Sequence, residues 1–93
     1  MSEREEFYEK LKNTLDDTTT YPSKYLYKFI VPNDKLKIEK IHKIFNFEGA
    51  VINTKRSKTG KFISLSILVK VDNSEIIIEK YKEIDRIEGI ISL

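Results

Sequence analysis

Four basic side chains lie close together in this chain: Lys55, Arg56, Lys58 and Lys61. They surround Gly60, in a stretch typical of a tight turn. Ammonium and guanidinium groups gathered in this way could hold a phosphate, a carboxylate or an acidic protein surface. The alternative is that they serve solubility and protect a sheet edge from aggregation. The residue types alone leave both interpretations open, so the cluster is a candidate partner or anion contact.

The same stretch fails the test for a nucleotide-binding phosphate loop. Such a loop needs a glycine five residues before its Gly-Lys pair and a Ser or Thr directly after the lysine. Here Lys55 stands where the first glycine is needed, and Phe62 stands where the Ser or Thr is needed after Lys61. We therefore expect no nucleotide site at this turn.

Catalytic and metal-binding patterns are equally weak. His42 is the single histidine, no cysteine occurs, and no carboxylate stands at a spacing that suggests a partner for His42. The acidic residues alternate with lysines, as in residues 39–40 and 79–80, which is typical of a solvated helix surface. We expect no catalytic residue, no metal ligand and no cofactor, and we interpret the chain as a non-enzyme.

Two aromatic residues suggest a different activity. Tyr27 and Phe62 fall on expected strands, and sheets of the ferredoxin-like class can bind RNA by stacking bases on such aromatics. The usual signature combines Lys or Arg, then Gly, with two aromatics on one strand. Residues 58–62 supply only the last aromatic. Single-stranded nucleic acid is therefore an alternative partner, and core packing is the simpler role for both rings.

Composition limits the class of protein. The chain has 93 residues, of which 40% are hydrophobic and 34% charged, which is typical of one globular domain. A net charge of +2 is too small to indicate nucleic-acid binding by itself. No apolar run is long enough to span a bilayer, and the acidic residues 3–6 are unlike a signal peptide. We therefore expect a cytoplasmic protein with no membrane partner.

An internal repeat gives the strongest evidence for the fold. Residues 31–53 are echoed by residues 71–93. The matching positions are Val31 and Val71, Asn33 and Asn73, residues 38–40 and 78–80, Ile44 and Ile84, and residues 48–49 and 88–89. The alternative is that the two segments share only helix start and stop signals, because many helices start after Asn or Asp and stop at Gly. We interpret the echo as one strand–helix–strand unit written twice.

The expected elements follow from apolar periodicity. A capping box at residues 2–5 starts a helix that should end near Leu15, before residues 16–20. Its stripe of Phe7, Leu11 and Leu15 should dock on the same domain or on a partner. Strands are expected at residues 25–31, 50–56, 61–71 and 90–93, the middle two forming a hairpin.

Two further helices should lie between these strands. The first should begin at Asn33 or Asp34 and close at Gly49. The second should begin at Asp72 and end at Gly89. Their apolar faces are Ile38, Ile41 and Phe45 in the first and Ile77, Tyr81 and Ile84 in the second.

The order of elements predicts an α+β fold of the ferredoxin-like βαββαβ type. Residues 1–20 should form a helical extension, and residues 21–93 a four-stranded antiparallel sheet with two helices on one face. The last strand should pair with the first, the first with the third, and the third with the second. In the third strand, Phe62 and Leu68 should face away from the helices, whereas Ile63, Leu65, Ile67, Val69 and Val71 should face them.

Several short segments resemble the YbeD-like family, small bacterial proteins built around a domain of unknown function. The segments are residues 21–22, 27–28, 57–58, 60–62, 64–66 and 88–93. The resemblance spans most of residues 19–93 and implies a ferredoxin-like fold similar to ACT-type regulatory domains. It implies no enzyme activity, and a role near lipoate metabolism is suggested for some members. Pro32 stands where glycine is expected in better-known relatives, which argues against an ACT-type amino-acid site.

The functional hypothesis is a binding or regulatory module that acts through its exposed sheet face or a sheet edge. Its partner would be a protein or a small molecule, and pairing of edge strands would allow a homodimer. The expected contact residues are Lys55, Arg56, Lys58, Lys61, Phe62 and Leu68. The alternative is single-stranded nucleic-acid binding through Tyr27, Phe62 and the basic hairpin.

Overall fold

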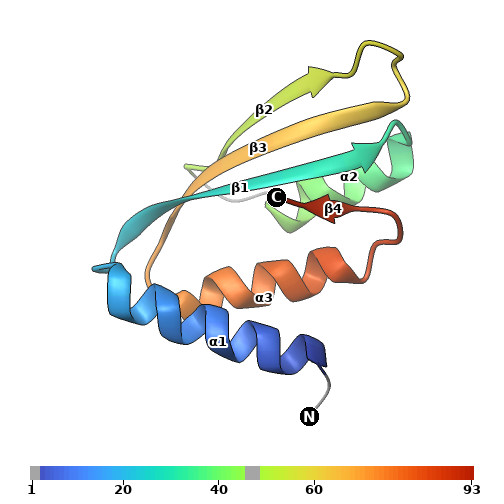
Figure 1. Ribbon diagram of the computed structural model, residues 1–93. Coiled ribbons are helices and arrows are strands. Elements are labelled where there is room, and N and C mark those ends of the chain that lie inside the picture. The colour runs from blue at the N-terminus through green and yellow to red at the C-terminus, as the bar shows by residue number, and fades with distance from the viewer. Residues whose placement is uncertain (1–2, 46–48) are drawn as a thin grey trace.

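The computed structural model describes residues 3–45 and 49–93 and confirms the expected α+β fold (Figure 1). Its elements are α1 (Glu3–Thr18), β1 (Ser23–Pro32), α2 (Lys35–Ile44), β2 (Val51–Arg56), β3 (Phe62–Val71), α3 (Ser74–Asp85) and β4 (Ile91–Ser92). The four strands form one antiparallel sheet in the order β2-β3-β1-β4, as the sequence predicts. The two halves of the echo thus form two strand–helix–strand units.

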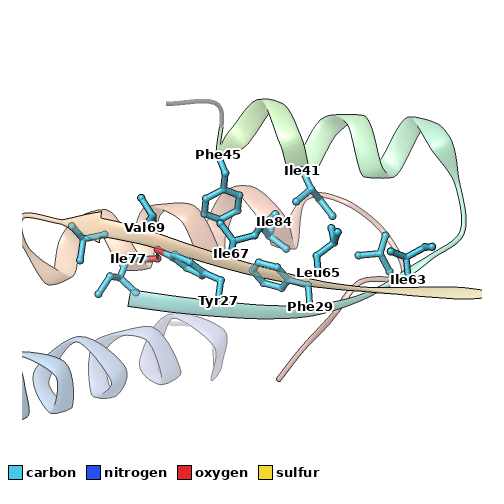
Figure 2. Packing of buried hydrophobic residues seen from close by; sticks show 12 residues of the cluster. Tyr27, Phe29, Ile41, Phe45, Ile63, Leu65, Ile67, Val69, Ile77 and Ile84 are labelled. Carbon is cyan, nitrogen blue, oxygen red and sulfur yellow. Dashed lines mark hydrogen bonds between the residues drawn. The ribbon is translucent and has the colours of Figure 1, made fainter. Parts of the chain in front are cut away.

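The central pair of strands determines which side chains face the core. β1 and β3 pair along ten residues, from Ser23 opposite Val71 to Pro32 opposite Phe62. Successive side chains of a strand point to opposite faces, so alternate residues of both strands meet α2 and α3. The buried cluster confirms the predicted set on β3 (Figure 2). Its members are Tyr27, Phe29, Val31, Ile41, Phe45, Ile63, Leu65, Ile67, Val69, Val71, Ile77 and Ile84.

The helices between the strands start as local capping requires, but both end earlier than expected. Asp34 caps α2 by accepting a hydrogen bond from the backbone N–H of Leu36. Asn73, rather than the predicted Asp72, caps α3 by accepting from the N–H of Ile76 at 3.0 Å. Asp and Asn side chains can both cap a helix, so residue type alone does not show which of two neighbouring residues is the N-cap.

The expected helix ends at the glycines are wrong. α2 ends at Ile44, with Phe45 as its C-cap, and α3 ends at Asp85. The expected continuation of α2 through residues 46–48 lies outside the described residues. Gly49 and Gly89 have positive φ angles of 88° and 83° and lie in the turns that lead into β2 and β4. Gly89 therefore serves the turn that follows α3 and does not terminate that helix.

The N-terminal helix is longer than predicted and packs along α3 (Figure 1). It continues to Thr18, three residues past the expected end at Leu15, because its polar residues find partners. The hydroxyl of Thr18 donates to the carbonyl of Thr14, and Asp16 accepts from Lys12 and from Ser74. Ser2, the first residue of the expected capping box, lies outside the described residues.

Ser74 anchors the end of α1 to the start of α3. Its side chain is only 2% exposed, and its Oγ donates to Oδ1 of Asp16 at 2.5 Å. This bond, followed by the hydrogen bond from Lys12, lowers the pKa of Asp16 below its ordinary value of 3.8. The charged carboxylate is therefore the form that holds α1 in place.

Opposite faces of the sheet should differ sharply in their tolerance of truncation. Replacing the fully buried Phe29 by alanine should lower the free energy of unfolding by about 3–5 kcal/mol, because it leaves a cavity in the core. The matched control is Phe62→Ala on the neighbouring strand, which should cost less than about 1 kcal/mol because that ring is 45% exposed. Urea unfolding of both variants measures the difference. Equal losses would contradict the assigned faces.

The anchoring of α1 should depend on pH. A lowered pKa means that the Asp16 contribution is present above about pH 3.8 and is lost as the pH falls through the folded-state pKa. Asp16→Asn should therefore raise amide hydrogen exchange throughout α1 at neutral pH while leaving β1 and β3 protected. Asp17→Asn makes the same charge change at an adjacent exposed residue and should leave exchange in α1 unchanged. Equal effects of the two variants would exclude the Ser74 anchor.

Candidate binding surface

The side of the sheet that faces away from α2 and α3 carries most of the exposed apolar side chains. We name this side the open face. Its strand positions are Lys24, Leu26, Lys28 and Ile30 on β1, Val51, Asn53 and Lys55 on β2, Phe62, Ser64, Ser66, Leu68 and Lys70 on β3, and Ile91 on β4. Among the described residues, eight large hydrophobic side chains are exposed, and five of them lie here: Leu26, Val51, Phe62, Leu68 and Ile91.

Three of these side chains form a row across adjacent strands. Leu68 lies directly opposite Leu26 on one side and Val51 on the other. Their exposed fractions are 36%, 46% and 53%, so each still offers apolar surface to a partner. With strands about 4.8 Å apart, a row over three strands spans roughly 10 Å. Ile30 and Ile91 form a second apolar pair farther along β1.

The charges of the open face have one sign. The four strands contain no aspartate or glutamate, and the open-face side chains that carry charge are Lys24, Lys28, Lys55 and Lys70. By contrast, α1 carries six acidic against three basic residues, and α3 carries four against two. The open face is thus basic, whereas α1 and α3 are acidic and α2, with four lysines against one glutamate, is basic.

Two of the lysines are in direct opposition. Lys24 and Lys70 are Cα partners in the β1–β3 ladder, and both are exposed on the open face. Directly opposed side chains on a sheet have Cβ atoms about 5 Å apart, and like charges at that separation destabilise the pair. No acidic side chain stands on the strands to offset this repulsion. Among the described residues, neither lysine takes part in an ion pair, and both lie beside the row of Leu26 and Leu68.

The hairpin cluster predicted from the sequence is only partly assembled on this face. Lys55 lies on the open face, opposite Ser64 of β3. Phe62 lies on the same face, two residues before Ser64. Arg56 alternates to the other face, and its guanidinium lies close to Gly60 in the turn. Lys58 and Lys61 are exposed around the turn itself.

The hairpin turn is held firmly by backbone and side-chain hydrogen bonds. The N–H of Gly60 donates to the carbonyl of Ser57, and the amide of Asn33 donates to the carbonyl of Gly60 at 2.8 Å. Asn33 also donates its backbone N–H to Lys61 at 2.9 Å. The turn is thus tied to the end of β1, which fixes Phe62 at the border of the open face.

Tyr27 does not reach the open face, which weakens the expected base-stacking surface. Its ring is fully buried among the aromatic core residues, and its hydroxyl donates to the carbonyl of Ile77 at 3.3 Å. Burial raises the pKa of Tyr27 above its ordinary value. On the open-face strand positions, Phe62 alone is aromatic. The stacking pair predicted from the sequence is therefore not formed.

The structure also shows where the candidates for catalysis and metal binding lie. His42 lies exposed on α2, away from the buried cluster. Within residues 3–45 and 49–93, no three histidine or carboxylate side chains gather as ligands for one metal ion. Over the same ranges, no helix combines the length and the apolar character needed to cross a membrane.

A groove lies between α1, α3, β1 and the β4 end of the chain. This groove has a volume of about 620 Å³ and is lined partly by Phe7, Leu11 and Tyr25. Arg4 and Asp85 form an ion pair at its rim, with a nitrogen–oxygen distance of 3.7 Å. Below them, the hydroxyls of Tyr25 and Tyr81 are 2.8 Å apart. Of the stripe predicted on the first helix, Phe7 and Leu11 line this groove, with Phe7 still exposed, and Leu15 packs against the buried cluster.

Of the contact residues expected from the sequence, Phe62, Leu68 and Lys55 lie on the open face, but most open-face positions were not among them. Lys24, Leu26, Lys28 and Lys70 were not among the expected contact residues. The available signal was the alternation of lysine with apolar residues in Ser23–Pro32, which identifies the outward positions once the buried set is known. The nearly continuous apolar character of that strand correctly indicated a central position.

The fold and this surface define the class of protein: a small ferredoxin-like α+β domain with a basic, partly apolar sheet face. Residues 16–93 match the family model described as protein of unknown function (DUF493), which is the YbeD-like family. The chain belongs to this family. No curated protein and no solved structure matches it significantly. The match begins near the end of α1, so most of that helix lies outside it.

The Tyr25–Tyr81 pair should contribute to stability in a pH-dependent manner. Burial, followed by the hydrogen bond to Tyr25, raises the pKa of Tyr81. A raised pKa favours the neutral native state, so this contribution is complete below about pH 10 and is lost as the pH rises through the folded-state pKa. Tyr81→Phe should lower the free energy of unfolding by about 1 kcal/mol at neutral pH and flatten its decline above pH 10.

A double-mutant cycle controls for the loss of each hydroxyl alone. Tyr25→Phe removes the other half of the same bond, so the double variant should lose less stability than the two single variants added together. Urea unfolding at neutral and alkaline pH provides the measurement. Strict additivity would show that the two hydroxyls do not interact.

Proposed function

We propose that this protein is a non-enzymatic binding module and that the open face is its binding surface. The observation that carries the proposal is the coincidence of exposed aliphatic side chains and exposed lysines on one side of the sheet. Leu26, Val51 and Leu68 are arranged as a contiguous row, and Lys24 and Lys70 flank it. Exposed apolar rows bordered by charge are typical of interaction surfaces.

The energetics of the sheet support this proposal. Fully burying an exposed leucine side chain is favourable by about 1.5–3 kcal/mol, so the row of three offers a substantial part of a binding energy. Opposed lysines, in contrast, cost stability in the isolated domain. A partner that covers the row and neutralises the lysines would bury the exposed apolar surface and remove the repulsion between the lysines. Either feature alone would be an ordinary property of a surface.

The same surface supports binding better than catalysis or base stacking. His42 is exposed on α2, which covers the side of the sheet opposite to the open face, and Tyr27 is buried. Only Phe62 remains as an aromatic platform on the open-face strands, and nucleic-acid stacking surfaces normally use several rings. A regulatory role, if the partner is itself regulated, would act through this binding step.

The proposal predicts a site-specific cross-link. A photoreactive amino acid in place of Leu68 should form a discrete adduct in an extract of cells that express the protein, and excess unlabelled protein should compete it away. Leu36 provides the matched control, because it is an exposed leucine, 69% accessible, on α2 rather than on the sheet. The probe at position 36 should give no competed adduct.

Competition by a variant identifies the surface more sharply. Leu26→Ser combined with Val51→Ser changes only exposed side chains, so the variant should fold, yet it should not compete for the adduct at position 68. Circular dichroism and urea unfolding establish that it is folded. Absence of an adduct at position 68, or full competition by the variant, would overturn the assignment of the open face.

A further inference from the structure

The charge pattern of the open face restricts the kind of partner it can accept. The inference rests on the proposed function and names the chemistry of the partner. All four charges at its strand positions are positive, and these strands contain no acidic residue. On the open face, the nearest apolar neighbours of Lys24 and Lys70 along their strands are Leu26 and Leu68. A complementary partner must therefore offer carboxylates or phosphates together with apolar groups.

A second copy of the chain is a poor occupant of this face. In a symmetric dimer the same patch meets itself across a two-fold axis, so four lysines would meet four lysines. Like-charge contact of this kind is strongly unfavourable once water is excluded. A copy docking through its acidic α1 and α3 would leave the open face of one copy and the helices of the other uncovered, and would build an open chain of molecules.

Nucleic acid satisfies the lysines but not the apolar row. Phosphates pair well with lysine, but sequence-tolerant binding of single strands also uses aromatic rings on which bases stack. Here the row is aliphatic, made of Leu26, Val51 and Leu68, with Phe62 as the single ring on the strand positions of this face. Aliphatic side chains are better covered by the aliphatic side chains of another protein.

The dimensions of the face fit one α-helix. The row of Leu26, Leu68 and Val51 spans roughly 10 Å, close to the diameter of a helix with its side chains. Along β1, Leu26 and Ile30 are about 13 Å apart, which is about two and a half helical turns. The inner face of the same sheet is covered by α2 and α3, so helix-on-sheet packing is the geometry this sheet already uses (Figure 2).

We propose that the open face docks an acidic amphipathic helix of a partner protein. The apolar stripe of that helix covers Leu26, Leu68 and Val51, and its carboxylates flank Lys24 and Lys70. The opposed lysines are thus a binding feature that the isolated domain tolerates at a cost in stability. Charge complementarity and the aliphatic row together select a protein segment with both properties.

The test uses the complete chain and a defined synthetic probe. The probe is a dye-labelled helical peptide of about 18 residues with leucines along one face and glutamates elsewhere, long enough to hold several turns. Fluorescence anisotropy measures its affinity at low and moderate salt. A peptide of identical composition, scrambled so that the leucines do not share a face, is the control. The ordered peptide should bind at least about tenfold more tightly, since only it buries the row.

Two lysine variants separate specific contact from general charge. Lys24→Gln with Lys70→Gln should weaken peptide binding by about tenfold, and it should leave the urea midpoint unchanged or higher because repulsion is relieved. Lys10→Gln with Lys40→Gln makes the same change in net charge on exposed helix positions and should change the affinity by less than about twofold. Equal weakening by the two double variants would overturn the proposed contact.

Other polyanions provide the competing outcomes. An oligothymidine of similar length and vesicles containing phosphatidylglycerol are titrated under the same conditions. Either one binding as tightly as the ordered peptide would overturn the inference in favour of nucleic acid or membrane, and so would equal binding of the scrambled peptide. A competed cross-link at position 68 together with no peptide binding would leave the open face as the binding surface and refute its acidic helical occupant.

Discussion

The antiparallel pairing of β1 with β3 is the constraint on which the rest of the structure depends. Ten consecutive residue pairs fix one register, and the two-residue period of a strand then divides every side chain between the core and the open face. A slip by one residue would send Tyr27 and Phe29 to water and bring Leu26 and Lys28 into the core. The aromatic cluster around Tyr27 makes that slip prohibitively costly.

This division also explains how a small domain can expose apolar side chains and remain folded. The core is complete without them, because α2 and α3 cover the inner residues of β1 and β3. The outer residues are therefore free to meet other demands, and on this sheet they combine aliphatic groups with lysine. Lysines on a sheet face also discourage unspecific stacking of sheets, since copies of the same face repel each other. Selectivity for an acidic partner would follow from the same property.

Much of this architecture could be predicted from the sequence, and the failures have local physical causes. The order of elements and the internal repeat predicted the strand order, and periodicity identified the buried residues of β3, because the alternation from Ile63 to Val71 is uninterrupted. The ends of α2 and α3 were misplaced because a glycine with positive φ serves a loop as well as a helix terminus. The cap at Asn73 was displaced by one residue, since Asp72 has the same capping chemistry. The extension of α1 to Thr18 depends on Ser74, a contact between residues far apart in the chain.

The candidate site was less predictable than the fold. A cluster that is compact in sequence, such as Lys55 to Lys61, is divided between two faces and a turn in space. Conversely, Lys24 and Lys70 are far apart in sequence and meet only because the ladder opposes them. Pairing between strands is therefore the information that a linear pattern lacks. Strand pairing determines which charged side chains lie together, and here it gathers only positive charges on the strand positions of the open face.

The most direct test of the account is the register that brings Leu26 opposite Leu68. The carbonyl of Lys28 accepts a backbone hydrogen bond from Leu93, so the backbone polar groups of Lys28 point toward β4. Leu26, two residues earlier, has the same orientation, so Leu26 and Leu68 form a pair without hydrogen bonds between them. Side chains come closest in pairs of this kind. The chain lacks cysteine, so a Leu26→Cys, Leu68→Cys variant permits one disulfide only. Mass spectrometry after mild oxidation should find that intramolecular bond nearly complete, whereas a Leu26→Cys, Ile67→Cys variant should stay reduced. Bond formation in the second variant and not in the first would contradict the register, and with it the open face.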